Sequence, residues 1–356
     1  MGLFAGQFDH ARRGFDADRR PDRRKTPPRL CAGRVAGRLS LFLILICLAW
    51  PLWADPIRVA TWHGDFSRKG PGLLLRDLRK GDVPGIEAIT AAKADVILLT
   101  NFDYDAGHLA LQALREVLSA QGLHYPHLFA EAPNTGVPTG LDADGDGQFG
   151  RPRDAQGFGY FSGQGGQAIL SRYPVRLIQD FTPLLWRDVP ESLMGALPGP
   201  ETQRLSSSAH WQIEVTTPGG VFSLLTLAAT PPVFDGPEDR NGRRNLDEVS
   251  LWRHVLEGRL GQAVSQPVVI GNLNLDPKRG DGRREAVQAL LDHARLQDPL
   301  PGRATVFWQK TGKMRVSYIL PDVEMEVQRA QVMRSVPGAG PHRLVWVDLN
   351  LVSEPD

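Results

Sequence analysis

Three aspartates at alternate positions form the clearest pattern for chemistry in this sequence of 356 residues. Asp142, Asp144 and Asp146 lie in the run Asp-Ala-Asp-Gly-Asp-Gly, which has the spacing that begins a calcium-binding loop. Carboxylates on a tight, glycine-containing turn can converge on one hard cation. The loop has Arg153 where an EF-hand has its last Glu, and no amphipathic helices flank it, so we do not expect an EF-hand. The two interpretations are a loop stabilised by Ca²⁺ and a solvated acidic turn.

Histidines and asparagines at the ends of apolar runs form the second group of candidate residues. His63, Asn272 and Asn274 follow such runs directly, and His342 precedes one. His210, on a predicted strand, is either a satisfied structural histidine or a substrate-binding residue. Asn245, at the start of a predicted helix, is either its N-cap or a substrate-binding residue.

The elements that must position these residues follow an α/β pattern, because short β-branched runs alternate with amphipathic stretches. The Gly- and Pro-rich stretch 133–166 is too long for a simple connection, and we expect an ordered functional loop or an insertion there. No internal repeat or second-domain linker is visible. We expect strands at 57–62, 96–100, 167–171, 207–215, 221–227, 268–271, 316–320 and 344–350, and helices at 73–79, 83–92, 109–120, 245–260 and 284–292.

Residues 1–54 have the pattern of a signal peptide, and residues 55–356 are expected to form one domain. Basic side chains precede the apolar run Leu39–Trp53, and Ala54 offers a small residue for cleavage. The run is shorter than the ~20 residues that a membrane-spanning helix needs, although a retained anchor is the alternative. We therefore expect a periplasmic or secreted protein with no stable membrane span.

Composition constrains the stabilising forces and the partners. Both cysteines, Cys31 and Cys47, lie in residues 1–54, so the remaining chain must rely on core burial instead of disulfides. Removing the 10 basic and 4 acidic side chains of residues 1–54 leaves 31 basic and 36 acidic ones, a net charge of −5. This balance does not favour nonspecific binding to nucleic acid, and we expect a monomer.

Five segments resemble, in order, the strand-end motifs of the endonuclease/exonuclease/phosphatase superfamily, and the stretch Thr230–Asn245 adds a similarity to a bacterial exported subgroup. The resemblance covers nearly all of residues 55–351. It implies an α/β fold of four layers, in which two mixed β-sheets pack face to face and are flanked by helices. The five segments are 58–63, 96–105, 268–277, 316–321 and 341–348.

The resemblance also implies a Mg²⁺-dependent phosphoester hydrolase, yet most of the family's catalytic positions are substituted. Only Asn274 and His342 keep the family's residues. His63 stands where the family has its first-strand Asn, Asn101 where it has the metal-anchoring Glu, and Ala228 where it has the mid-chain His. Asn272 takes the place of the Asp of the Asp-x-Asn pair, Ser317 that of the Asp before the Tyr, and Pro341 that of the Asp before the final His.

These substitutions predict an exported, catalytically lapsed member that acts by binding a ligand or a phosphate ester. A Mg²⁺ site usually keeps one or two carboxylates, and Asn101, Asn272 and Ser317 offer none. The alternative is an active, divalent-metal-dependent phosphoesterase of phosphodiesterase or nuclease type, with His63, Asp103 and His342 as relocated ligands. In the first case we expect His63 to be a hydrogen-bonded residue that fills the vacated site.

Overall fold

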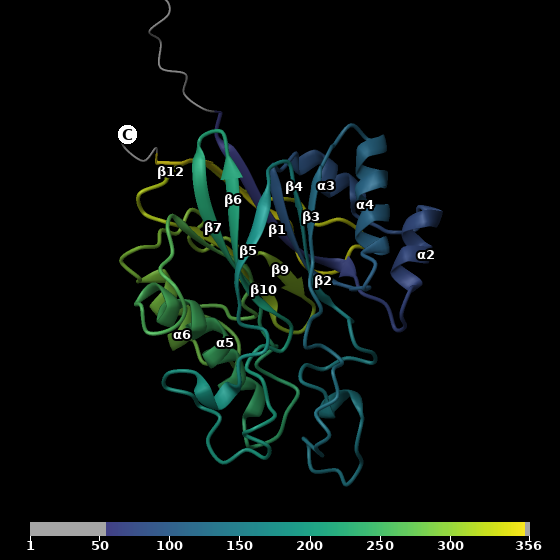
Figure 1. The fold of residues 1–356 in the computed structure, drawn as a ribbon, viewed down its shortest axis with the longest axis vertical. Coiled ribbons are helices and arrows are strands. Elements are labelled where there is room, and N and C mark those ends of the chain that lie inside the picture. The colour runs from purple at the N-terminus through teal and green to yellow at the C-terminus, as the bar shows by residue number, and fades with distance from the viewer. Residues whose placement is uncertain (1–54, 353–356) are drawn as a thin grey trace, which may run out of the picture. The chain divides into compact units, whose positions relative to one another are not determined.

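The computed structural model describes residues 55–352, so the expected signal peptide lies outside the described residues. Two mixed β-sheets form the centre of the domain (Figure 1). One has the order β12-β13-β1-β2-β4-β3 and the other the order β11-β8-β7-β6-β5, and β9 and β10 form a separate hairpin. The strands are β1 Ile57–Phe66, β2 Val96–Phe102, β3 His127–Phe129, β4 Gly166–Ser171, β5 Val175–Asp180, β6 His210–Thr217, β7 Gly220–Ala228, β8 Pro267–Asn272, β9 Val306–Trp308, β10 Gly312–Met314, β11 Ser317–Pro321, β12 Glu326–Val332 and β13 Val345–Asn350.

Helices cover the outer face of each sheet, which gives the four layers expected from the sequence. Helices α2, α3 and α4 pack on the six-stranded sheet, and α5 and α6 pack on the five-stranded one (Figure 1). A third apolar core lies between the two sheets. The expected sandwich is therefore confirmed. The helices are α2 Leu73–Lys80, α3 Ile86–Ala92, α4 Leu109–Ala120, α5 Arg240–Leu256 and α6 Glu285–Leu291.

The β2 strand shows why the central strands are apolar on both faces. Successive side chains of a strand point to opposite faces. Ile97 and Leu99 belong to the core under the helices, whereas Val96 and Leu98 belong to the core between the sheets. A strand buried on both sides reads as a continuous apolar run, which is how β2 was recognisable in the sequence.

Two parallel strand pairs bring the candidate residues to one edge of the sandwich. β1 and β2 are parallel, with His63 beside Thr100, and β7 and β8 are parallel, with Ala228 beside Asn272. Antiparallel β11 places Ser317 beside Asn272. β1 also contacts β8 and β11 across the sandwich, so the carboxyl ends of β1, β2, β7 and β8 meet at the same edge.

The long stretch 133–166 is a loop with one 3₁₀ turn at Pro152–Asp154, and it is tied to both halves of the sandwich. Asn134 donates through Nδ2 to the carbonyl oxygens of Thr182 and Ser206, at 2.6 and 2.8 Å. Gly157 lies so close to Ser207 that a Cβ atom would come within 1.8 Å of its carbonyl oxygen, so only glycine fits this approach. None of the helices within residues 55–352 has the length and hydropathy needed to span a bilayer.

Helix α5 begins at Arg240 and not near Asn245, so the prediction of its start was wrong. Residues 240–244 offer no apolar side chain to mark a helix, yet Arg244 is buried and donates to the carbonyl oxygens of Leu205 and Arg204. These contacts extend the helix through a turn without apolar residues. Asn245 therefore lies inside the helix and cannot cap it.

Candidate functional site

The side chains at this edge form what we call the strand-end site: His63, Asn101, Asn272, Asn274, Ser317 and His342. His63 lies at its centre. Its Nδ1 atom is 3.1 Å from Asn272 Nδ2 and 3.0 Å from Thr100 Oγ1. Because an amide nitrogen can only donate, His63 Nδ1 accepts this bond and its ring proton lies on Nε2. Thr100 is a residue that the sequence did not mark, since its place in a buried strand gave no chemical signal.

The His342 ring packs against that of His63 in a tilted arrangement, with ring centroids 4.5 Å apart and an interplanar angle of 48°. Trp308 contacts the His342 ring edge-on, and Trp62 Nε1 donates to the His342 carbonyl oxygen at 3.1 Å. Within residues 55–352, His342 Nδ1 has no hydrogen-bond partner. The residue before His342 is Pro341, which supplies no carboxylate to orient the ring.

Both histidines are neutral near pH 7. Surrounding protein desolvates His63 and lowers its pKa to about 4, and burial lowers the pKa of His342 to about 2, with a further contribution from His63. Two uncharged imidazoles therefore stand where a phosphate-binding site needs a cation. Either ring can still donate or accept a hydrogen bond.

Amide groups replace the expected acid at the end of β8. Asn272 donates through Nδ2 to Asn274 Oδ1 at 3.1 Å, and the backbone N–H of Asn274 donates to Asn272 Oδ1 at 3.2 Å. Asn274 in turn donates to the Ala229 carbonyl oxygen at 2.7 Å. On the neighbouring strand, Ser317 Oγ is buried and has no partner within the described part of the chain. The result is an amide network with a free hydroxyl beside it.

Asn101 has a structural role that a carboxylate could not fill. It lies in the left-handed region, with φ of 62°, which asparagine tolerates better than most residues. Its Nδ2 atom donates to the Gly64 carbonyl oxygen at 2.9 Å and so joins the ends of β1 and β2. The pairing of these strands shifts register between His63 and Phe66, and Asn101 supplies a bond at this irregularity.

Both carboxylate oxygens of Asp103 are occupied by backbone donors. Its Oδ2 accepts from the backbone N–H of Arg68 at 2.8 Å, and its Oδ1 accepts from that of Gly165 at 2.9 Å. Burial raises the pKa of Asp103, and these bonds act against the rise. The carboxylate thus fastens two loops together.

His210 and Asn245 are both buried and lie among structural contacts. The ring nitrogens of His210 pair with Ser206 Oγ at 2.7 Å and with the Glu248 carbonyl oxygen at 3.0 Å. Asn245 Nδ2 donates to the carbonyl oxygens of Thr230 and Leu273, at 2.7 and 2.9 Å. The bond to Leu273 ties α5 to the segment just after β8, next to Asn272. Neither residue contacts His63 or His342 through a hydrogen bond of the described chain.

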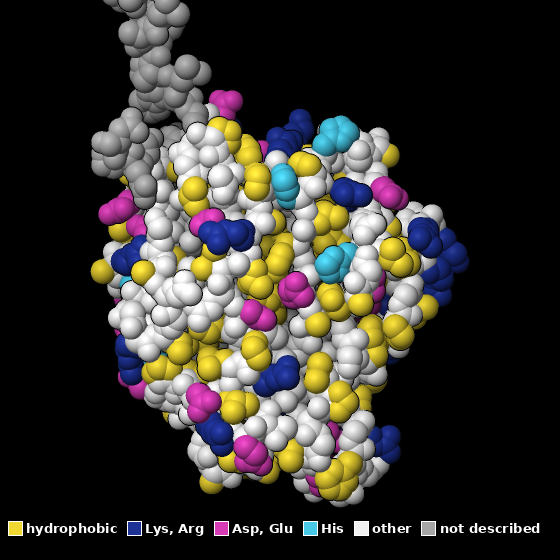
Figure 2. All heavy atoms as spheres, viewed as in Figure 1, with side chains coloured by type: hydrophobic (Ala, Val, Ile, Leu, Met, Phe, Trp, Pro, Cys, Tyr) yellow, Lys and Arg dark blue, Asp and Glu magenta, His cyan; other side chains and the backbone are white. Residues whose placement is uncertain are grey.

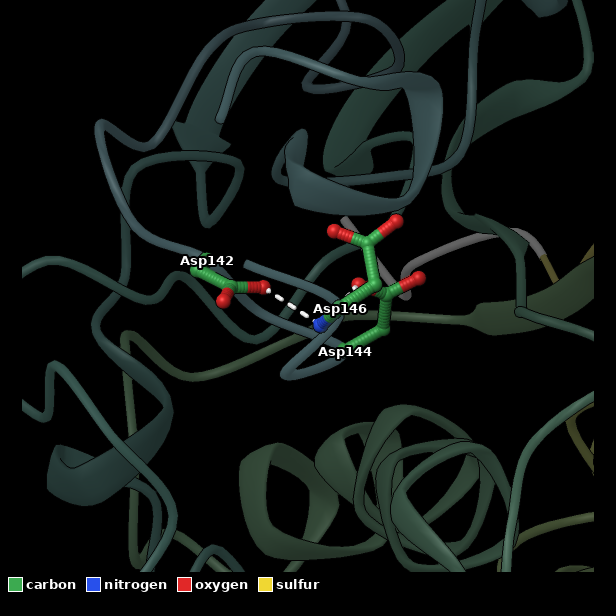
Figure 3. Close-up of side chains that lie close together, drawn as sticks. All are labelled: Asp142, Asp144 and Asp146. Carbon is green, nitrogen blue, oxygen red and sulfur yellow. Dashed lines mark hydrogen bonds between the residues drawn. The ribbon is translucent and has the colours of Figure 1, made fainter. Parts of the chain in front are cut away.

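The three aspartates of the acidic loop do converge (Figure 3). Each offers a carboxylate oxygen, and these atoms lie within 4.8 Å of one another. Asp142 also accepts from the backbone N–H groups of Gly145 and Gly147, at 2.8 Å each, which shapes the turn. Arg153 Nε lies 4.0 Å from Asp144 Oδ2. In the described chain, this is the one group of three or more His, Cys, Asp or Glu side chains within reach of a single ion, so the strand-end site has no such group.

Comparisons with known proteins agree with this architecture. A structure of an endonuclease/exonuclease/phosphatase from Beutenbergia cavernae superposes with a TM-score of 0.53 at 17% identity, covering 83% of this chain and 72% of that one. A family protein from Leptotrichia buccalis gives a TM-score of 0.50 at 14% identity, covering 83% of this chain and 100% of that one. No curated protein matches significantly. Because the family model for the endonuclease/exonuclease/phosphatase family matches residues 74–342, this chain belongs to that family.

Proposed function

We propose that this chain is a catalytically lapsed member of its family that acts by binding at the strand-end site. The family generally depends on a divalent metal. The strand-end side chains do not fit Mg²⁺, because that ion takes hard oxygen ligands that normally include a carboxylate. Amides, imidazoles and one hydroxyl occupy the positions instead. This loss of every carboxylate is the observation that carries the proposal.

The arrangement of Asp103 weakens the alternative of relocated metal ligands. Both of its oxygens already accept backbone N–H groups, from Arg68 and Gly165. Turning Asp103 toward His63 would leave these N–H groups without their partner, at a cost of about 1–3 kcal/mol for each one that stays buried. The geometry supports a structural carboxylate over a metal ligand.

The chemistry of the site favours an uncharged polar ligand over a phosphate ester. Neutral His63 and His342 supply no positive charge, and the amides supply donors and acceptors together. His342 Nδ1 and Ser317 Oγ are enclosed and lack partners within residues 55–352, so the site holds polar groups that the described chain leaves unsatisfied. We therefore propose a ligand that carries hydroxyl or amide groups.

A cleavage assay tests the proposal. The full chain should show no Mg²⁺- or Mn²⁺-dependent cleavage of DNA, RNA or simple phosphodiesters above background, because losses of metal ligand, base and His partner act as a unit. Turnover by the unmodified chain that disappears in His342→Ala would refute the proposal. It would favour an active phosphoesterase with relocated ligands.

We propose that the acidic loop binds Ca²⁺, since its three carboxylates converge.

We propose export with removal of residues 1–54, which the basic and then apolar sequence supports. Intact-mass measurement of secreted material tests this, and recovery of an uncleaved chain would contradict it. We propose that nucleic acid is not a partner, because residues 55–356 carry a net charge of −5 and acidic and basic side chains are interspersed over much of the face in Figure 2, where the basic ones gather chiefly over α2.

A further inference from the structure

An open cavity of about 300 Å³ lies on the outer helical layer, outside the strand-end site. It is bounded by α5, the start of α6 and the segment 190–193. Its polar lining comes largely from one face of α5, because Asp247, Ser250 and His254 are spaced by three and four residues. Asn245, two residues before Asp247, points to the other side of the helix. The cavity is therefore separate from the strand-end site.

Asp247 is a buried carboxylate with incomplete pairing. It is 2% exposed, and its Oδ2 accepts from Trp186 Nε1 at 2.6 Å and from the Leu193 N–H at 2.7 Å. In the described chain no group donates to its Oδ1, and no basic side chain pairs with it within 4.0 Å. Burial raises the pKa of Asp247 to about 6. Arg243 and Arg283 attract this charge from beyond ion-pair distance, so Oδ1 is the carboxylate atom that a further donor could bond.

His254 adds a second unpartnered group to the same cavity. It is 1% exposed, and neither ring nitrogen has a partner among the described residues; Nδ1 is enclosed, so Nε2 is the nitrogen that a ligand could reach. Burial and the neighbouring Arg253 lower its pKa, so the ring is neutral and can accept a hydrogen bond. About two helical turns, or roughly 10 Å along the axis, separate it from Asp247. The cavity thus offers acceptors near both ends.

The arginines that line the cavity are already paired. Arg253 donates to Glu191 at 2.8 Å and also bonds Glu257, and Arg283 donates to Asp239 at 2.7 Å. An incoming anion would have to break these pairs. A cation, by contrast, would complete the pairing of Asp247.

We propose that this cavity binds a small aliphatic amine that carries a second hydrogen-bond donor, such as a diamine or an amino alcohol. The ammonium group pairs with Asp247 beside Ser250, and the second donor reaches His254. A charge-assisted bond to a buried carboxylate is among the stronger single polar contacts in proteins. The volume is at the lower end for small-molecule sites and suits a ligand of this size.

Calorimetry on the full chain with four probes of one length tests the proposal. Diaminobutane should bind saturably and butylamine more weakly, while butanediol and succinate should not bind. Asp247→Asn should weaken the binding of diaminobutane by about tenfold or more, because the substitution removes the charge of the side chain and keeps its shape. His254→Phe should reduce the affinity for diaminobutane to that for butylamine. The matched control Asp292→Asn, at an exposed carboxylate just after α6, should bind like the unmodified chain.

Two outcomes would overturn the proposal. One is the absence of saturable diaminobutane binding, and the other is binding of succinate or butanediol as strong as that of diaminobutane. Should Asp247→Asn fail to fold by circular dichroism, Ser250→Leu decides, since its side chain would fill the cavity and should abolish binding. Unchanged binding in Ser250→Leu would place the amine elsewhere. These results do not depend on the cleavage assay of the strand-end site.

Discussion

At the scale of single residues, an amide does things here that the corresponding acid cannot. Asn272 donates to His63 and to Asn274, whereas an ionised Asp could only accept. The sequence predicted that these residues meet, because their motifs come in the family's order. It could not predict that Asn101 would join β1 to β2, since that bond depends on a left-handed backbone at a register shift. The sequence gives the identity of each side chain, but backbone geometry decides which hydrogen bonds that side chain makes.

His210 leads to a residue-scale prediction about pH. Burial lowers its pKa to about 4, against about 6.5 in the unfolded chain, so the unfolded state binds the proton between these values. Its contribution to stability is complete above about pH 6.5 and falls by roughly 2 kcal/mol by about pH 5. In urea unfolding, the free energy of unfolding of His210→Gln should fall by roughly 2 kcal/mol less between pH 7 and about pH 5 than that of the unmodified chain. Exposed His124→Gln is the control and should leave the pH dependence unchanged. Equal pH dependence in all three proteins would contradict the prediction.

At the scale of elements, success in prediction followed the strength of the periodic signal. Helix α4 was predicted with its observed bounds, because its apolar residues recur at helical spacing. Strands β5 and β12, at the edges of the two sheets, were missed, and the polar sequence of largely exposed β12 gives no alternation. Strands β3, β9 and β10 were also missed, because three residues are too few for a periodic signal. The start of α5 was missed because buried Arg244 acts through hydrogen bonds and not through hydrophobicity. Edge strands and polar helix ends owe their structure to tertiary contacts that one sequence does not display.

The acidic loop gives an element-scale prediction. A ligand that binds only the folded state raises the melting temperature in proportion to its occupancy. The melting temperature should therefore be higher in millimolar Ca²⁺ than with a chelator. Asp144→Asn should reduce this rise, and Arg153→Ala should enlarge it, because the guanidinium 4.0 Å from Asp144 competes with the ion. Identical melting curves with Ca²⁺ and with chelator would show that the loop is only a polar turn.

At the scale of the whole molecule, a scaffold of four layers surrounds a strand-end site whose six side chains include no carboxylate. The sheets and their helices depend on three apolar cores, and none of the substituted positions belongs to them. The strand-end residues could therefore change without loss of the fold. This separation explains why the sequence predicted the architecture well. The sequence did not predict the identity of a ligand, because a ligand is recognised by a few polar atoms whose positions only the structure supplies.

The same separation predicts that family chemistry can be returned only by several changes together. Asn101→Glu alone should not produce cleavage, because it removes the bond to Gly64, places Glu in a left-handed conformation that costs about 1–2 kcal/mol, and adds a single carboxylate. The protein that carries all six substitutions given below should bind Mn²⁺, as measured by calorimetry, and should also show metal-dependent phosphodiester cleavage. Adding His342→Ala to it should remove cleavage and largely keep metal binding. Cleavage by Asn101→Glu alone would show that the other positions were never needed. The combined set is His63→Asn, Asn101→Glu, Ala228→His, Asn272→Asp, Ser317→Asp and Pro341→Asp.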